Sequence, residues 1–214
     1  LLQSVFMLID WCDVLHFEVR GTGTVTREDL TSALPADDLV VRAARALQKA
    51  TGCPQGVHIG VSKHIPAQAG LGGGSSDAAS TLLALNRLWK LKLSRHQLHS
   101  IALTLGADVP FFLCCSSAWV EGIGDIIRPL ELEHQLPPAA FAGVEPEAGL
   151  DTRMIFSHPS LKRDSSCATI SGFAATHYQF GSNDLQPVAQ ALCPEITQAI
   201  NWLESKGLQG RMTG

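Results

Sequence analysis

Alternation of apolar and polar positions along the chain predicts several short strands. Residues 14–20 show it most clearly, because every second side chain is apolar, which is the period of a half-buried strand. Alternation or a short apolar run predicts strands in three further segments: residues 57–61, 118–120 and 126–128. The last two are expected to form a hairpin. Residues 1–9 are apolar at spacings that fit either a strand or a helix.

Apolar side chains three and four positions apart predict helices in other parts of the chain. One such helix is expected to start after Asp37, which is a suitable N-cap, and another after residues 75–77, where serine and aspartate are again suitable caps. A third begins at Ser94 with the S-x-x-Q pattern of a capping box. Pro194 suits the first position of a fourth helix.

A segment at residues 134–138 that ends in two prolines is the expected domain boundary. It divides an N-terminal domain, residues 1–136, from a C-terminal domain, residues 137–214. In the second domain, residues 139–144 are expected to form the first strand. Residues 160–179 are rich in Ser, Thr and Ala with little periodicity and are expected to form a loop. Both ends of the chain fall inside patterned segments, so we expect a fragment of a longer protein.

Composition narrows the class of protein. The 214 residues are 45% hydrophobic and 17% charged, which is typical of a globular chain long enough to form a core. The net charge is −4 and no basic stripe is present, which argues against nucleic-acid binding. No apolar run approaches the length of a membrane span, and no signal peptide is recognisable. We expect a cytoplasmic protein with a small-molecule substrate, as a monomer or weak homodimer.

The cysteines show no metal-binding or redox spacing. There are six: Cys12, Cys53, Cys114, Cys115, Cys167 and Cys193. None belongs to a C-x-x-C pair or to a His/Cys cluster of zinc type, so no residue is assigned as a metal ligand. In a chain of this size, scattered cysteines are typical of buried small hydrophobic residues in a reducing compartment.

A glycine-rich segment follows the strand at residues 57–61 and precedes a helix. The segment comprises Pro66, Ala67, Gln68, Ala69, Gly70, Leu71, Gly72, Gly73, Gly74, Ser75 and Ser76. A strand, a glycine loop and a helix N-terminus together favour phosphate binding, because free amides and the helix dipole converge at one point. The spacing matches neither a Walker A loop nor a dinucleotide-binding loop. The alternative is a mobile, glycine-rich surface loop.

Asp108 is a single acid within the apolar run at residues 106–112. A buried carboxylate without a partner is unfavourable, so Asp108 should accept hydrogen bonds or contact a cation. The alternative is a helix N-cap, with Pro110 in the first turn, and the two readings are compatible.

The glycine segment resembles motif 2 of the GHMP kinases. Its triple glycine and double serine are similar to the family that phosphorylates the 2-hydroxyl of 4-diphosphocytidyl-2-C-methyl-D-erythritol, in the non-mevalonate route to isoprenoids. The resemblance continues at residues 106–111 and at Met212-Thr213-Gly214, the first half of motif 3. It implies an α+β GHMP kinase fold, in which a ribosomal protein S5 domain 2-like domain precedes a ferredoxin-like domain. It also implies ATP and Mg²⁺ as cofactors.

The resemblance assigns roles to individual residues. Asp108 is implied as the catalytic acid/base, and the glycine segment as the ATP phosphate site. Thr152 and Phe156 are implied to contact the cytidine, for which a hydroxyl and an aromatic face are suited; a core Phe at a helix start is the alternative. Asp38 stands where the family has an asparagine near the adenine, so it is expected to make a weakened contact there or to cap a helix.

The chain departs from the family pattern in one respect that bears on catalysis. The family's catalytic lysine and a nucleobase-contacting histidine belong upstream of Leu1, and Lys63 has no matching role in the family. The 214-residue chain is therefore expected to be inactive or nearly so by itself. Two other functions remain open: a GHMP kinase of homoserine or mevalonate type, and a non-catalytic nucleotide-binding module.

Overall fold

A computed structural model describes residues 2–66, 69–131, 136–146 and 149–213. The described residues fall into two compact units. The first contains the residues up to 66 and those from 72 to 131, and the second contains residues 69–71 and those from 136 onward. Within these ranges, no helix has the length and apolar character needed to cross a membrane.

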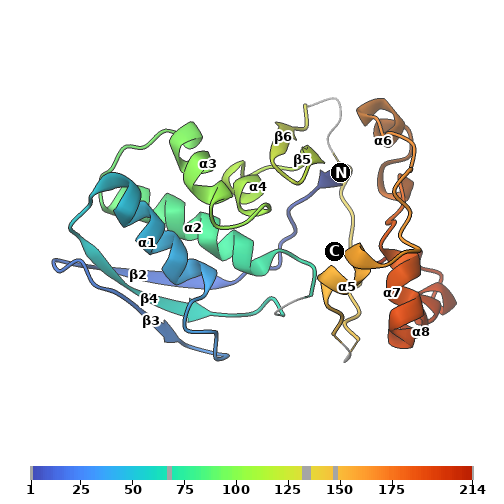
Figure 1. Cartoon of the computed structure of the whole chain (residues 1–214), viewed down its shortest axis with the longest axis horizontal. Helices are drawn as coiled ribbons and strands as arrows, with labels where there is room; N and C mark the ends of the chain where they lie inside the picture. The colour runs from blue at the N-terminus through green and yellow to red at the C-terminus, as the bar shows by residue number, and fades with distance from the viewer. Residues whose placement is uncertain (1, 67–68, 132–135, 147–148, 214) are drawn as a thin grey trace. The chain divides into compact units, whose positions relative to one another are not determined.

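The first unit contains a sheet in the order β2-β4-β3 (Figure 1). The central strand β4 (Gly56–Ser62) pairs antiparallel with β2 (Val14–Arg20) and parallel with β3 (Val25–Asp29). The parallel pair requires a crossover connection, which the helix α1 (Leu39–Thr51) supplies. The strands predicted at residues 14–20 and 57–61 are thus confirmed.

A second sheet in this unit has the order β1-β5-β6 and is antiparallel throughout. The strand β1 (Leu2–Phe6) pairs with β5 (Ala118–Gly122), so the ambiguous N-terminal segment forms a strand over these residues. The strands β5 and β6 (Ile126–Pro129) form the expected hairpin. Pairing with a distant strand decided what local spacing at the N-terminus left open.

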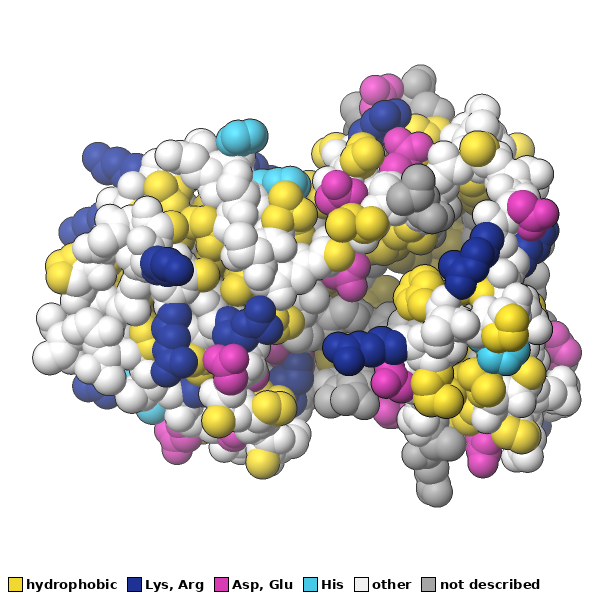
Figure 2. Space-filling view, viewed as in Figure 1, with side chains coloured by type: hydrophobic (Ala, Val, Ile, Leu, Met, Phe, Trp, Pro, Cys, Tyr) yellow, Lys and Arg dark blue, Asp and Glu magenta, His cyan; other side chains and the backbone are white. Residues whose placement is uncertain are grey.

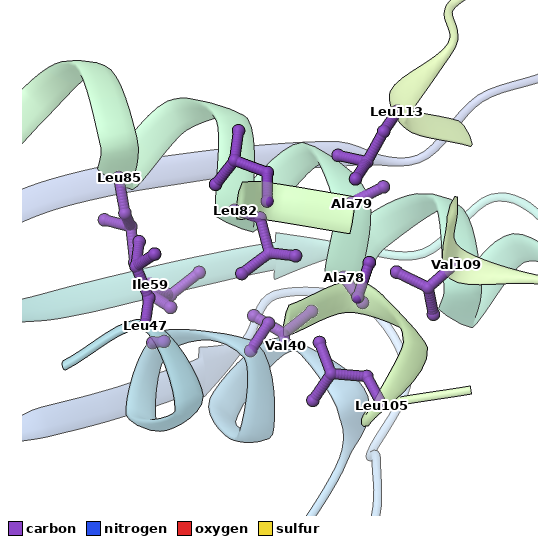
Figure 3. Close-up of a cluster of buried hydrophobic side chains, with 14 of the residues drawn as sticks. Val40, Leu47, Ile59, Ala78, Ala79, Leu82, Leu85, Leu105, Val109 and Leu113 are labelled. Atoms are coloured by element: carbon purple, nitrogen blue, oxygen red, sulfur yellow. The ribbon is translucent and has the colours of Figure 1, made fainter. Parts of the chain in front are cut away.

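The helices α1 and α2 (Gly73–Leu88) lie on one face of the β2-β4-β3 sheet (Figure 1). Figure 3 shows Leu82 and Leu85 of α2 in the same apolar cluster as Leu47 of α1 and Ile59 of β4. These four side chains have no exposed surface. The short helices α3 (Arg95–Leu103) and α4 (Val109–Leu113) add further apolar residues to this core.

The N-caps of these helices confirm one prediction and correct two. Ser94 and Gln97 form the expected capping box at α3. At α1 the capping side chain is that of Asp38, which accepts from the Val41 amide at 3.1 Å, and not that of Asp37. The helix α2 begins two residues before its expected serine and aspartate caps. Its N-cap is Gly72, a residue that adopts the left-handed backbone conformation without strain.

The second unit contains the helices α5 (Thr152–Ser157), α6 (Ile170–Thr176), α7 (Gln186–Leu192) and α8 (Pro194–Ser205), with a 3₁₀ turn at His177–Gln179. Its small core is formed by Ile155, Leu161, Val188 and Ala189. The expected helix start at Pro194 is confirmed.

Two predictions for this unit are wrong. Residues 139–144 form no strand; a strand needs a partner for its backbone hydrogen bonds, and the described part of the second unit contains none. Residues 160–179 are not entirely a loop, because α6 forms within them. The Thr169 side chain accepts from the Gly172 amide at 3.1 Å and caps this helix.

The cysteines also correct an expectation. All six are free thiols, but Cys12, Cys115 and Cys167 are exposed and only Cys193 is buried.

On the face drawn in Figure 2, basic and acidic side chains are intermingled with apolar ones.

Candidate active site

The glycine segment ends at the N-terminus of α2. Gly70 and Gly72 have φ angles of +70° and +68°, which glycine adopts readily. The first helical hydrogen bond runs from the Ser76 amide to the Gly72 carbonyl at 2.9 Å. The amides of Gly73, Gly74 and Ser75 therefore have no acceptor within the helix. A helix start of this kind can bind an anion.

Close packing explains two of the glycines. A Cβ atom at Gly72 would lie 2.9 Å from the Phe112 ring, and one at Gly73 would lie 3.0 Å from the Ile65 side chain. The Phe112 contact brings α4 against the first turn of α2. Of the predicted phosphate-binding residues, Ala67 and Gln68 lie outside the described residues. Pro66 and Ala69 are described on either side of them.

Asp108 occupies the N-cap position of α4, but its side chain makes no capping hydrogen bond. Within the described ranges, its carboxylate has no hydrogen-bond or ion-pair partner. Partial burial raises the pKa of this carboxyl above its usual value. Asp108 as a whole residue is exposed, so a substrate can reach it, and its partly buried carboxyl has the increased proton affinity that a general base requires.

A buried ion cluster that the sequence reasoning missed lies at residues flanking the glycine segment. Lys63, which follows β4, pairs with Asp13 and, at 2.8 Å, with Asp77 of α2. The exposed fractions of these side chains are 10% for Lys63, 1% for Asp13 and 8% for Asp77. Asp77 lies between Ser76 and Ala78, among buried residues of α2. That single acid was the signal that a counter-charge must lie nearby.

The two carboxylates of the cluster differ in proton affinity. Burial raises the pKa of Asp77 to about 6 against the lowering effect of Lys63, and the neighbouring Asp13 adds to the increase. Burial also tends to raise the pKa of Asp13. Hydrogen bonds from Lys63 and from the amides of Ile65 and His64 lower it by more, so the pKa of Asp13 lies below the usual value.

Asp38 caps a helix, which is one of the two roles that the sequence predicted for it. Its Oδ1 accepts from the Val41 amide and lies 2.8 Å from Arg27. Arg27 also pairs with Asp29 at 2.7 Å and donates to two backbone carbonyls. A contact from Asp38 to adenine stays a prediction.

The predicted cytidine residues lie on α5. Asp151 caps this helix by accepting from the Arg153 amide at 2.8 Å. Phe156 is 54% exposed, so the alternative that it is a core residue is wrong; its neighbour Ile155, 5% exposed, has that role. Thr152 is the first residue of α5, and its side chain lies outside what the structure describes.

Comparison with known proteins identifies the family. The GHMP kinases N terminal domain family matches residues 38–116. The 4-diphosphocytidyl-2-C-methyl-D-erythritol kinase of Acidovorax ebreus (strain TPSY) is 97% identical over the whole chain, which spans 76% of that relative. The enzyme of the same name from Paracidovorax citrulli (strain AAC00-1) is 68% identical, with 75% of its length covered.

Comparison with solved structures indicates the same family and fold. A crystal structure of 4-(cytidine 5'-diphospho)-2C-methyl-D-erythritol kinase matches with a TM-score of 0.79 and 29% identity, over 99% of this chain and 78% of that one. Homoserine kinase from Cytophaga hutchinsonii, at 16% identity and a TM-score of 0.51, covers 76% of this chain and 57% of its own and shows the fold alone. The expected GHMP kinase fold is therefore confirmed, and the chain belongs to the 4-diphosphocytidyl-2-C-methyl-D-erythritol kinase family.

Proposed function

We propose that the protein to which this chain belongs transfers the γ-phosphoryl group of ATP to the 2-hydroxyl of 4-diphosphocytidyl-2-C-methyl-D-erythritol, a step of isoprenoid biosynthesis. The observation that carries the proposal is 97% identity, over the whole chain, to a kinase named for that acceptor. A helix start with free amides and the partly buried carboxyl of Asp108, which has a raised proton affinity, support it.

The first turn of α2 binds the nucleotide phosphates in this proposal. The amides of Gly73 to Ser75 donate to phosphate oxygens, and the positive end of the helix dipole adds to the attraction. No side chain caps α2, so none competes with the phosphate for these amides. A cavity of about 150 Å³ beside Lys63 and Pro66, lined also by residues 32–34, is the candidate position for the nucleotide base.

Mg²⁺ enters as part of the MgATP substrate. In the described ranges no three His, Cys, Asp or Glu side chains are grouped as a metal site. The ion would be held mainly by phosphate oxygens and water, and it would offset the phosphate charge.

Asp108 orients the acceptor hydroxyl and accepts its proton. A raised pKa improves a carboxylate as a base near neutral pH. Phosphoryl transfer depends mainly on positioning and charge stabilisation, so the larger part of this role is to hold the hydroxyl in line with the phosphate.

The second unit supplies the acceptor site in this proposal. Exposed Phe156 stacks on the cytosine and Thr152 contacts it. We also propose domains at residues 1–136 and 137–214, the second of ferredoxin-like fold, in a cytoplasmic monomer or weak homodimer. The division of the described residues into two compact units between 131 and 136 supports that boundary.

A turnover assay tests the function. The protein carrying this chain at the full length of its relatives is incubated with MgATP and, separately, the cytidylyl acceptor, homoserine or mevalonate, and products are followed by ³¹P NMR. We expect a phosphorylated product only from the cytidylyl acceptor. Product from another alcohol, or ATP binding without any product, contradicts the proposal. The same assay on the 214 residues alone checks the expectation that they turn over slowly or not at all.

The variant Asp108→Asn tests the base. The amide cannot accept the hydroxyl proton, so we expect kcat to fall by about 10²- to 10⁴-fold, while the affinity for a non-hydrolysable ATP analogue stays near that of the wild type. In the wild type, kcat falls as the pH drops through the pKa of Asp108, above the ordinary value of 3.8. An unchanged kcat in the variant would exclude Asp108 as the base.

A further inference from the structure

The cluster of Asp13, Lys63 and Asp77 joins three separate parts of the first unit. Asp13 precedes β2, Lys63 follows β4, and Asp77 lies in α2. Each side chain is at least nine-tenths buried. Buried charges persist only where partners satisfy them, so this arrangement holds its three segments in one geometry.

Both flanks of the glycine segment are tied into the cluster. Asp13 Oδ1 accepts from the amides of His64 at 2.6 Å and Ile65 at 2.9 Å, which fixes the main chain just before the segment. The Lys63 ammonium then contacts Asp77, in the second turn of the helix that follows the segment. The flanks are thereby joined by side chains as well as by the intervening backbone.

Gly73 permits this close approach. A Cβ atom there would lie 3.0 Å from the Ile65 side chain and 3.4 Å from Lys63 Nζ. The first turn of α2 therefore packs directly against the residues before the glycine segment. The amides that the proposed function assigns to phosphate binding belong to this same turn.

Lys63 is not free to act as a phosphate ligand in this geometry. Its ammonium donates to two carboxylates, so its positive charge is more than balanced within the cluster. The lysine holds protein segments together, which leaves the main-chain amides as the phosphate donors of the proposed function.

We propose that Asp13, Lys63 and Asp77 are positioning residues, which preorganise the first turn of α2 for the polyphosphate of the nucleotide. This inference rests on the proposed kinase function. Preorganisation increases affinity because the ligand no longer has to order the site.

The experiment compares nucleotide affinity in variants of the cluster. Asp77→Asn keeps the shape and removes one charge, and Asp13→Asn weakens the hold on residues 64 and 65. For each we expect the Kd of Mg²⁺ with a non-hydrolysable ATP analogue, measured by calorimetry, to rise about tenfold or more. In turnover, KM for ATP should rise with little change in kcat or in KM for the acceptor.

A matched control separates positioning from stability. Leu47→Ala removes a fully buried core side chain of α1 and should lower the melting temperature at least as much as Asp77→Asn. It touches none of the cluster, so its Kd for the analogue should stay near that of the wild type. Hydrogen exchange of the Ser76 and Asp77 amides supplies a readout independent of ligand. Measured relative to the exchange of β4 amides, which reports global opening, it should quicken in the cluster variants and not in Leu47→Ala.

The outcomes are distinguishable. A wild type that binds the analogue, with folded cluster variants that bind equally well, overturns this inference and leaves the kinase function standing. Loss of binding in Lys63→Met with wild-type binding in both aspartate variants makes Lys63 a direct phosphate ligand and also overturns it. A wild type that does not bind overturns the proposed function and this inference together.

Discussion

Single buried charges govern the chemistry of this protein at the residue scale. Asp13 and Asp77 share one lysine, and two carboxylates near one cation cannot both ionise equally easily. Asp13, with two amide donors, has its pKa lowered, whereas the pKa of Asp77 is raised to about 6 by burial and by Asp13. One acid of the pair therefore changes charge close to neutral pH.

Asp77 should make the stability of the protein depend on pH. Because its pKa is about 6 when folded and near 3.8 when unfolded, the folded state binds the extra proton between these values. The wild type should thus lose stability as the pH rises from 4 to 7, by up to about 3 kcal/mol for a shift of roughly two units.

The measurement is the free energy of unfolding in urea at pH 4, 5, 6 and 7 for the wild type and Asp77→Asn. The asparagine cannot ionise, so the difference between the two proteins isolates Asp77. The free energy of unfolding of the wild type should therefore decrease relative to that of Asp77→Asn as the pH increases. A constant difference across the series would refute the raised pKa.

At the scale of single elements, the helix caps separate structural from ligand-binding helix starts. The side chains of Asp38 and Ser94 accept hydrogen bonds from amides of α1 and α3, whereas the N-cap of α2 is Gly72, which has no side chain. A capping oxygen and a phosphate would compete for the same amides. The one uncapped start among these three is the one at the glycine segment.

Gly72 should tolerate no side chain. Gly72→Ala places a Cβ atom 2.9 Å from the Phe112 ring on a backbone with φ of +68°, which together should destabilise the protein by about 1–3 kcal/mol. Gly74→Ala is the control: its nearest atom is Leu39 Cδ1 at 3.6 Å, and alanine in a helix gains up to about 1 kcal/mol over glycine. Urea unfolding measures both, and equal stabilities would contradict the packing argument.

Local patterns predicted the elements whose stability is local. The capping box at Ser94, the hairpin of β5 and β6 and the start of α8 at Pro194 all depend on neighbours within a few residues. The strand expected at residues 139–144 failed because a strand depends on a partner elsewhere in the chain.

At the scale of the whole molecule, the two units differ in their cores. The first has an extensive cluster built around α1, α2 and β4, including the fully buried Leu47, Ile59 and Leu82. The second has a small one around Val188 and Ala189. Since burial of apolar surface is the main stabilising term, the first unit should be the more stable.

Native-state hydrogen exchange should show this difference. Amides of β4 and α2 should exchange only through global opening, and those of α7 and α8 at lower free energy. Leu82→Ala, which truncates a fully buried side chain, should lower protection across the first unit by roughly 2–5 kcal/mol. Equal protection in both units of the wild type would contradict the ordering.

The sequence by itself determined the strand, glycine loop and helix order, the single acid at Asp108 and the family resemblance, because these depend on residue types at short spacing. Only the tertiary structure decided that Asp13 and Asp77 meet at Lys63, that Phe156 is exposed and that Gly72 is the N-cap of α2. Such features depend on contacts between segments distant in the chain. Long-range contacts are set by the balance of burial and pairing over the whole fold, which no local pattern contains.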